Sequence, residues 1–280
     1  MNAKDFYPGV FSRNAAHYRA RAERLMKSGE ATSRFALMDA VRPRRGMRIL
    51  DLACGPGTIT IPMAREMAGE GEVIGVDLAD GMLEAARAAA LGKGLPVRFL
   101  KMDIEVLQFP PHSFDAVTCA HGLQFAPNLG KVLREARRVL KIRGKFAASV
   151  PTEARPTDPS PAEEALELLL DTRLGKAAAP EDTEGTRALV NDPDRFQSVA
   201  VQAGLRAVEV ERIDSETSWE NAAQYVTMSL SWWRNAARTE GLSATERDVL
   251  VAEATRAVEE VVGTGSFMVP SHAYLLKAEG

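Results

Sequence analysis

Between residues 47 and 151, short apolar segments alternate with alanine- and leucine-rich segments, and this alternation constrains the fold more than any other feature of the chain. The segments GMLEAARAAALGKG and NLGKVLREARRVLKIRG predict helices that end near a glycine. Short apolar strands separated by helices indicate βαβ units, and therefore an α/β fold on a mostly parallel sheet. The expected strands are MRILDLA (47–53), GEVIGVDL (71–78), PVRFLKMD (96–103), FDAVTCAHG (114–122) and GKFAASVP (144–151).

The segments on either side of this region have other patterns. Residues 12–41 are rich in Ala, Arg, Leu and Met, and they predict two helices before a turn at Pro43. After residue 151, the prolines of PTEARPTDPSP predict a loop or an insertion. We expect a helix at 162–171 and then a polar stretch that reaches Asp192.

The C-terminal part returns to regular structure. Residues 193–215 predict a helix, a stop at Gly204 and a strand. A mainly helical block is expected at 219–262, and SFMVPSHAYLLKAEG predicts a final strand. We therefore expect an N-terminal helical lid (1–42), a core (43–151, 193–215 and 266–280) and a cap that could hold substrate (152–192 and 216–265).

The composition disfavours several classes of function. A formal net charge of -3 over 280 residues disfavours nucleic acid as a partner, because binding through phosphates requires a basic face. No apolar run approaches the ~20 residues that span a bilayer, and the N-terminal segment lacks the apolar region of a signal peptide. The two cysteines, Cys54 and Cys119, do not make a disulfide framework and suit buried packing positions. We therefore expect a cytoplasmic protein.

The first expected strand runs into the turn DLACGPGT (51–58), which has the composition of a ligand-binding turn. A phosphate-binding P-loop requires a lysine that does not follow Gly57 at the necessary place. A dinucleotide site requires a third glycine where this chain has Thr60. A pyrophosphate would also be unfavourable near the carboxylate of Asp51, at the end of the strand.

A ligand with an ammonium group and a sulfonium cation removes this conflict, because a nearby carboxylate attracts both cations. S-adenosylmethionine is such a ligand. The small residues Ala53, Gly55 and Gly57 would let the backbone approach its amino-acid part, close to Asp51.

Acidic residues also end the next two expected strands. Asp77 is placed to accept hydrogen bonds from both ribose hydroxyls, although an aspartate there could also cap a helix. Asp103 could accept from the exocyclic amine of adenine, with Ile104 against the ring. Leu78 and Met82 would cover the other side of the adenine.

These motifs resemble those of class I S-adenosylmethionine-dependent methyltransferases, in particular the branch with the ubiquinone and menaquinone C-methyltransferases and many small-molecule methyltransferases. The matching segments are ILDLACGPGT, VIGVDLADGMLEAAR, KMDIEVLQFPPHSFDAVTCAHGLQF and NLGKVLREARRVLKIRGKFAASV. The resemblance implies a Rossmann-like sheet of seven strands, the last one antiparallel, with helices on both faces and a helical cap formed by insertions. KIRGKF departs from the Lys-Pro-Gly-Gly that is usual before the fifth strand, and we expect it to alter a turn far from the cofactor.

The resemblance also implies residues around the methionine end of the cofactor. His121 follows the fourth strand beside Ala120, and its imidazole could deprotonate a phenol or an activated carbon acid. Alternatively, His121 only hydrogen-bonds the cofactor or the loop backbone. Tyr18 is the candidate for binding the methionine carboxylate, unless its segment is a frayed arm.

The remaining candidates have simpler interpretations. We expect His272, beside the last strand, to cap an element or to face solvent, and the alternative is that it faces the cap. The aromatic residues from Trp219 to Trp233 favour a buried cap core over a ligand wall, although an inner face could serve as both. No group of His, Cys and Asp has the spacing of metal ligands, so no metal is expected.

Together these features predict an enzyme that methylates a small, largely apolar molecule, such as a phenol, quinol or polyketide intermediate, at oxygen or carbon by in-line displacement. A homodimer is possible. A nucleic-acid amino-methyltransferase is disfavoured because AHGLQF stands where that class has [DN]-P-P-[YF]. The alternative is a protein that binds S-adenosylmethionine without methylating, either a cyclase-like enzyme or an accessory subunit.

Overall fold

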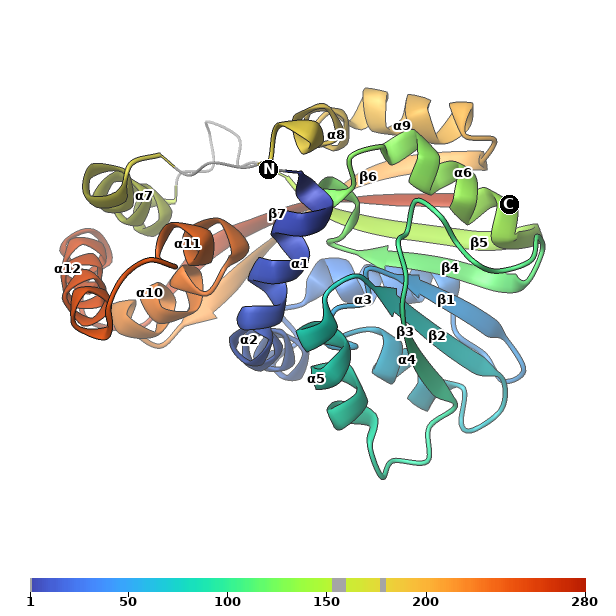
Figure 1. The fold of residues 1–280 in the computed structure, drawn as a ribbon, viewed down its shortest axis with the longest axis horizontal. Coiled ribbons are helices and arrows are strands. Elements are labelled where there is room, and N and C mark those ends of the chain that lie inside the picture. Colours follow the sequence, from blue (N-terminus) through green and yellow to red (C-terminus); the bar gives the residue numbers. More distant parts are fainter. Residues whose placement is uncertain (1, 153–159, 177–179) are drawn as a thin grey trace.

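The computed structural model describes residues 2–152, 160–176 and 180–280. Its centre is a seven-stranded sheet in the order β3-β2-β1-β4-β5-β7-β6 (Figure 1). The strands are β1 (Arg48–Leu52), β2 (Glu72–Asp77), β3 (Val97–Lys101), β4 (Phe114–Ala120), β5 (Leu140–Pro151), β6 (Arg206–Trp219) and β7 (Phe267–Glu279).

The first five strands pair in parallel, and β7 is antiparallel to both of its neighbours. β1 pairs with β2 and β4, β2 pairs with β3, and β4 pairs with β5, all in parallel. β7 pairs antiparallel with β5 and β6. The predicted α/β class, the seven strands and the antiparallel last strand are confirmed. Because parallel strands end at one edge of the sheet, the turns after β1, β2, β3 and β4 meet there.

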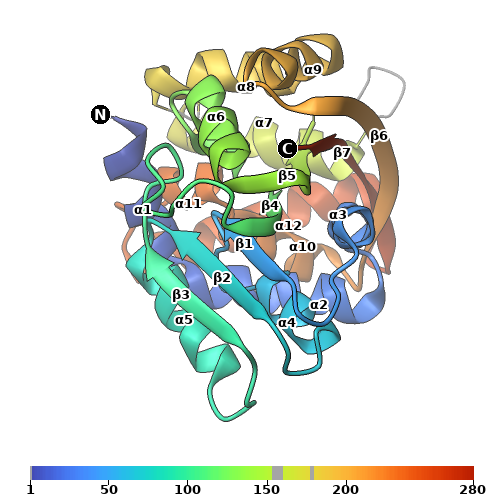
Figure 2. The same ribbon diagram turned by 90° about the vertical axis from the view of Figure 1, so that its right-hand side faces the viewer.

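Helices cover both faces of the sheet (Figure 2). On one face, buried residues of α6 (Leu129–Val139) and α9 (Pro193–Gln202) pack against the strands. On the other face, α3 (Thr32–Val41) and α4 (Thr60–Glu66) do so, and α5 (Asp80–Ala90) packs alongside. Burying one large aliphatic side chain stabilises such a layer by about 1.5–3 kcal/mol.

Three helices precede the sheet where the sequence predicted two. They are α1 (Ala3–Arg13), α2 (Ala15–Ser28) and α3, and the first contains Pro8. Its start is stabilised by Asn2, whose side chain accepts a hydrogen bond from the backbone N–H of Asp5. The first helix was missed because proline normally marks a break. α3 packs on the sheet, so only α1 and α2 have the position of a lid.

The cap is built on the outer halves of the two C-terminal strands. α7 (Pro161–Leu174), α10 (Ala222–Leu230) and α12 (Ala244–Val262) share a hydrophobic cluster with Trp219 and Val269, and α11 (Trp233–Arg238) follows α10. The ladder between β6 and β7 is paired from Arg206↔Glu279 out to Trp219↔Phe267. The placement of Trp219 in a helical block was therefore wrong, because this residue ends a strand that runs into the cap.

Two further expectations need correction. The polar stretch before Asp192 contains a 3-10 turn (Glu181–Thr183) and α8 (Glu184–Val190), and Val190 is buried against the core. KIRGKF lies within β5 instead of forming a separate turn, with a register irregularity opposite Phe114–Ala116. Residues 153–159, which include most of the proline-rich stretch, lie outside the described residues.

The contact between α1 and α5 is testable at Gly81. A Cβ atom there would be 2.5 Å from the backbone oxygen of Ser12, and the Gly81 N–H donates to Ser12 Oγ at 3.2 Å. Gly81→Ala should push α1 away, while it adds up to about 1 kcal/mol of helix propensity to α5. We expect faster amide hydrogen exchange in residues 3–13 without a lower Tm.

Gly185→Ala is the matched control, because a Cβ on this helical glycine in α8 meets no atom within 4 Å. It should leave exchange in α1 unchanged. If amide exchange in residues 3–13 is also unchanged in Gly81→Ala, close packing on α5 does not hold α1 in place.

Candidate functional site

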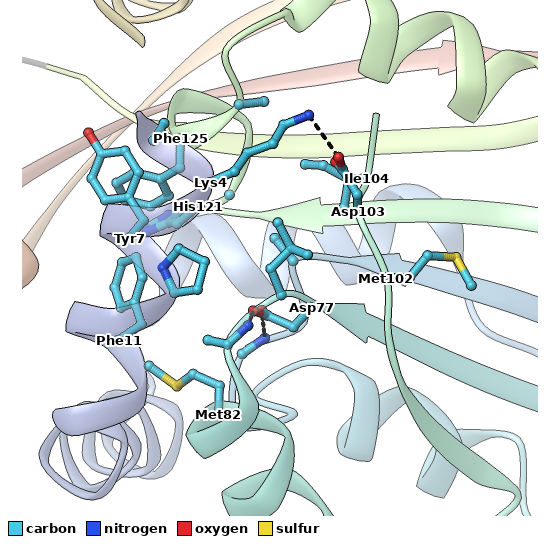
Figure 3. Close-up of a pocket in the computed structure, with 18 of the residues that line it drawn as sticks. Lys4, Tyr7, Phe11, Asp77, Met82, Met102, Asp103, Ile104, His121 and Phe125 are labelled. Carbon is cyan, nitrogen blue, oxygen red and sulfur yellow. Dashed lines mark hydrogen bonds and ion pairs between the residues drawn. The ribbon is translucent and has the colours of Figure 1, made fainter. Parts of the chain in front are cut away.

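A cleft lies at the edge of the sheet where the parallel strands end, and α1 forms its opposite wall (Figure 3). Asp51 and Gly57 are the two predicted site residues that do not line it. The ten that do are Tyr18, Ala53, Gly55, Asp77, Leu78, Met82, Asp103, Ile104, Ala120 and His121.

Asp77 joins the turn after β1 to the turn after β2. Its carboxylate accepts from the backbone N–H of Gly55 at 2.9 Å and from that of Ala79 at 2.9 Å. Burial raises the pKa of Asp77, and the backbone donors partly oppose this shift. Because each carboxylate oxygen has more than one lone pair, the group can still accept hydroxyl donors from the cleft.

The two glycines of the turn have different surroundings. Gly55 has φ +54°, and a Cβ atom there would meet nothing within 4 Å, so this residue leaves space in the cleft. Gly57 has φ +80°, but its Cβ position is 3.1 Å from both Ile61 and Phe99. Gly57 therefore permits close packing beneath the turn and does not line the cleft, contrary to its predicted place in the site.

Asp51 is fully buried beneath the turn. Thr60 Oγ1 donates to its carboxylate at 2.5 Å and Thr118 Oγ1 at 2.8 Å. Burial raises the pKa of Asp51 to about 7, and these two hydroxyls limit the rise. Thr60, which replaces the third glycine of a dinucleotide motif, thus has its own function in holding this acid.

A small tail pocket opens from the cleft above Asp51, and it is also lined by Tyr18, Arg34, Gly55 and Ala120. Arg34 is buried in α3, and its guanidinium donates to the Tyr18 hydroxyl at 3.5 Å. The pocket therefore has an acid on one side and a cation on the other. No motif in the sequence marks Arg34, because it reaches the site through the packing of α3 on the sheet.

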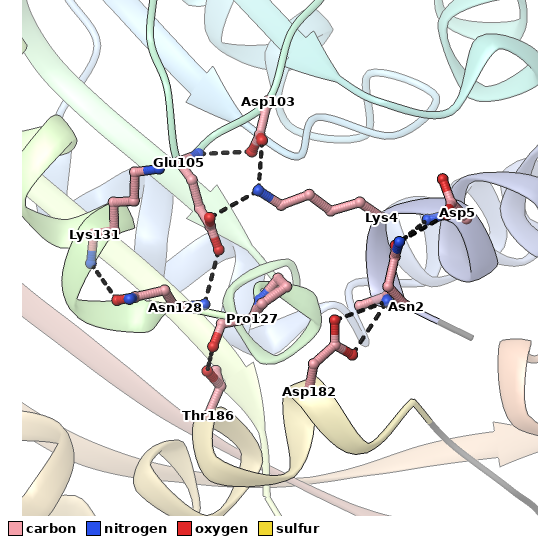
Figure 4. A network of polar contacts seen from close by, with 11 residues as sticks. Asn2, Lys4, Asp5, Asp103, Glu105, Pro127, Asn128, Lys131, Asp182 and Thr186 are labelled. Atoms are coloured by element: carbon pink, nitrogen blue, oxygen red, sulfur yellow. Dashed lines mark hydrogen bonds and ion pairs between the residues drawn. The ribbon is translucent and has the colours of Figure 1, made fainter.

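The outer end of the cleft is closed by an ion-pair network (Figure 4). Lys4 Nζ of α1 lies 2.7 Å from Asp103 Oδ2 and 2.8 Å from Glu105 Oε2. The backbone N–H of Ala3 donates to both oxygens of Asp182 at 3.1 Å. Asp103 therefore lies on the cleft as expected, but its carboxylate is already paired with a lysine that the sequence did not indicate.

Aromatic rings from α1 form the wall between the cleft and the cap. The ring centroids of Tyr7 and Phe125 are 4.7 Å apart, and those of Phe11 and Phe125 are 5.2 Å apart. Tyr7 also contacts Trp233 of the cap at 5.2 Å. The sequence signal was the i,i+4 spacing of Tyr7 and Phe11, which places both rings on one helix face, but Pro8 concealed the helix.

His121 lies between the cleft and the cap. Its backbone is left-handed, with φ +58°, and its Nε2 is 3.0 Å from Ser33 Oγ. Burial, together with the positive charges of Arg34 and Arg21, holds the pKa of His121 well below its usual value near 6.5. The imidazole is therefore neutral at pH 7.

Two further hollows lie between the core and the cap. The junction pocket is lined by Tyr18, Arg21, Glu30, Ser33, Arg34, His121 and His272, among others. The cap cavity is lined by Arg21, Trp219, Tyr225, Trp232, Trp233 and His272, among others.

The structure bears on two expectations about the cap. Trp219 and Tyr225 are buried in the cap core and also line the cavity. His272 does not face solvent as expected. Its side chain is only 7% exposed, and its Nδ1 lies 2.6 Å from Asp214 Oδ1, because β7 is covered by the cap.

Several chemistries are absent from the described part of the chain. It contains no group of three or more His, Cys, Asp or Glu residues that could hold a metal ion. Cys54 and Cys119 are buried and free, and burial raises the pKa of both thiols. Among the same residues, no helix has the length and apolarity needed to cross a membrane.

Comparisons with known proteins place this geometry in a family. Residues 49–144 match the model of a methyltransferase domain. The chain is 31% identical over 231 residues to the nocamycin O-methyltransferase of Saccharothrix syringae, covering 79% of this chain and 80% of that protein. The chain belongs to the class I S-adenosylmethionine-dependent methyltransferases.

Other relatives match a shorter part of the chain. The chain is 36% identical over 146 residues to the ubiquinone/menaquinone biosynthesis C-methyltransferase of Idiomarina loihiensis, which is 51% of this chain and 57% of that protein. It thus spans about half the length of this and similar curated relatives. In structure it is similar to the YcgJ protein from Bacillus subtilis, with a TM-score of 0.56, 22% identity and coverage of 89% and 97%.

The network at Lys4 predicts how α1 is held against the core. Lys4→Met leaves Glu105, whose side chain is only 6% exposed, without its cation. Loss of a partner from a buried charge destabilises by about 1–3 kcal/mol. We expect faster proteolysis within residues 3–13 and faster amide exchange there.

Arg13→Met, at the other end of α1, is the control, because Arg13 and its partner Glu240 are both 53% exposed. Such an exposed pair contributes about 0–1 kcal/mol. Equal effects of the two substitutions would contradict an anchoring function for Lys4.

Proposed function

We propose that the protein transfers the methyl group of S-adenosylmethionine to an oxygen or carbon atom of a small molecule with a flat, largely apolar body. The observation that supports this proposal is that the cleft and the junction pocket share His121 and Tyr18 in their lining. The cleft around Asp77 suits the donor, and the junction pocket in turn shares Arg21 and Trp232 with the aromatic cap cavity.

The residues of the cleft fit the nucleoside part of the cofactor. Asp77 has lone pairs for the two ribose hydroxyls, and Gly55 leaves the space that the ribose requires. Leu78, Met82 and Ile104 offer an apolar slot for the adenine. Asp103 would accept from the adenine amine, beside or in place of Lys4.

The tail pocket fits the amino-acid part of the cofactor. The amino-acid part carries an ammonium group and a carboxylate. In the tail pocket, Asp51 can attract the ammonium group, and Arg34, with Tyr18 beside it, can bind the carboxylate. These charges hold the ends of the ligand and leave the sulfur without a carboxylate, which would stabilise the reactant cation more than the transition state.

When bound, S-adenosylmethionine supplies an electrophilic methyl group on a sulfonium centre. The protein then has to align the acceptor behind that methyl group and exclude water. Alignment of this kind can contribute about 7–11 kcal/mol. His121 is neutral and a weak base, so we assign it a positioning function through a hydrogen bond to the acceptor, supported by Ser33. The non-methylating alternative is not favoured, because the named relatives are methyltransferases.

The test is transfer of tritiated methyl groups from S-adenosylmethionine to a panel of phenols, quinols and polyketide acids. Asp77→Asn should weaken binding of S-adenosylhomocysteine at least tenfold and reduce transfer accordingly. Asp80→Asn is the control, because this residue of the same turn is exposed and paired with Lys101. Binding of S-adenosylhomocysteine without transfer to any acceptor would contradict the proposed reaction.

The raised pKa of Asp51 predicts a pH dependence of cofactor binding. The ammonium group favours ionised Asp51, whose pKa in the free protein is raised to about 7 by burial. Protonation therefore opposes binding below pH 7, and the affinity for S-adenosylhomocysteine should rise several-fold from pH 6.0 to 7.5. Isothermal titration should detect proton release in this range.

Asp51→Asn should remove the pH dependence and lower the affinity at pH 7.5, whereas Asp39→Asn, at an exposed residue of α3, should change neither. An affinity that is independent of pH in the unmodified protein would show that Asp51 does not contact the ammonium group.

A further inference from the structure

Arg21 is a partly buried cation at the boundary between the core and the cap. It lies on α2 and lines both the junction pocket and the cap cavity. Its guanidinium carbon is 4.5 Å from the ring centroid of Trp232, which itself stacks on Tyr18 with centroids 5.9 Å apart. The side chain is thus held against an aromatic surface with its donors next to open space.

No carboxylate among the described residues pairs with Arg21. Its Nε is buried without a hydrogen-bond partner, and the charged or titratable groups that act on it are Tyr18, Arg24, Arg34 and Tyr225. Arg238 of the cap is a direct contrast. Its side chain is 4% exposed, and it pairs with Glu167 at 3.0 Å and with Asp171 at 2.8 Å.

An unpaired guanidinium in such a place is unfavourable in the absence of a ligand. Burial lowers the pKa of Arg21 to about 10, and the charge of Arg34 adds to this effect, but the group remains charged at neutral pH. Stacking on Trp232 offsets only part of the cost of withdrawing an unpaired charge from water. This imbalance points to a site whose counter-charge comes from outside the protein.

We propose that the acceptor is an organic anion, a carboxylic acid with a flat aromatic or polyene body, and that Arg21 binds its carboxylate in the junction pocket. The inference rests on the proposed function and names its substrate class. It assigns to Arg21 a binding function distinct from that of Arg34, because Arg34 lines the tail pocket and Arg21 does not.

The chemistry of the two hollows agrees with this class of acceptor. A guanidinium binds a carboxylate with two parallel hydrogen bonds, which orients it more strictly than a point charge does. The rings of Trp219, Tyr225 and Trp232 supply the apolar wall for the body. The positive field that keeps His121 neutral also keeps the acid ionised.

The reaction then needs no general base. A lone pair of one carboxylate oxygen forms the new bond to the methyl carbon as the carbon–sulfur bond breaks, and the electron pair of that bond stays on sulfur. An anion and a sulfonium cation give a neutral ester and a neutral thioether, and no proton is transferred. Because the product has lost its charge, Arg21 no longer holds it, which favours release.

The test compares acids with their neutral amides at saturating S-adenosylhomocysteine. The probes are benzoate and benzamide, 1-naphthoate and 1-naphthamide, and anthraquinone-2-carboxylate with its carboxamide, measured by isothermal titration. We expect at least one acid to bind tenfold or more tightly than its amide. Arg21→Met should abolish the preference and Arg21→Lys should retain part of it. Arg19→Met, on the same helix and paired with Glu23, should not change it.

Unchanged affinity for S-adenosylhomocysteine shows that each variant is folded. No preference for any acid, or a preference that survives Arg21→Met, overturns the inference and leaves Arg21 as a structural partner of Trp232. The test distinguishes failure of this inference from failure of the proposed function. Methyl transfer to neutral phenols without a preference for acids would contradict only the carboxylate inference. Acid binding that depends on Arg21, without any methyl transfer, would contradict only the proposed reaction.

Discussion

The hydrogen bonds that Asp77 accepts from two separate turns fix the geometry on which the rest of the site depends. They join the end of β1 to the end of β2 and so fix the turn at Gly55. Gly55 takes a left-handed conformation there and leaves space in the cleft. Asp51 beneath the turn and Tyr18 above it are both positioned relative to this junction. A carboxylate that organises a turn and also faces a ligand cannot be replaced by an amide without loss of one of the two functions.

The charged groups around the cleft are divided between two clusters. Asp77 and Asp103 line the cleft and Asp51 lies beneath the turn, whereas Arg21 and Arg34 line the junction pocket together with neutral His121. In the proposed reaction, a cationic donor and an anionic acceptor would each meet the opposite charge in its own compartment. Specificity for the acceptor would thus be separated from affinity for the donor.

The sequence predicted the positions of residues where these depend on local order along the chain. Asp77, Asp103 and His121 were placed at one edge because a parallel sheet brings its carboxyl ends together, and all three line the cleft. Residues that reach the site through packing were missed. Lys4 and Arg34 have no motif, Pro8 concealed a helix, and Trp219 was assigned to a helix because the end of its strand, residues 214–218, is polar. The carboxylates that pair with Lys4 lie 99 and 101 positions away and Arg34 contacts a residue of another helix, so the local pattern does not encode these contacts.

The ladder between β6 and β7 has a consequence for the route by which ligands exchange. From Glu209 to Trp219 it runs without a register shift from the sheet into the cap, so swinging the cap outward would break a row of backbone hydrogen bonds. The N-terminal helices, in contrast, are held by the ion pairs of Lys4 and Arg13 and by the ring contacts of Tyr7 and Phe11, with no such ladder in the described part of the chain. We therefore expect ligands to exchange by displacement of the N-terminal helices and not of the cap.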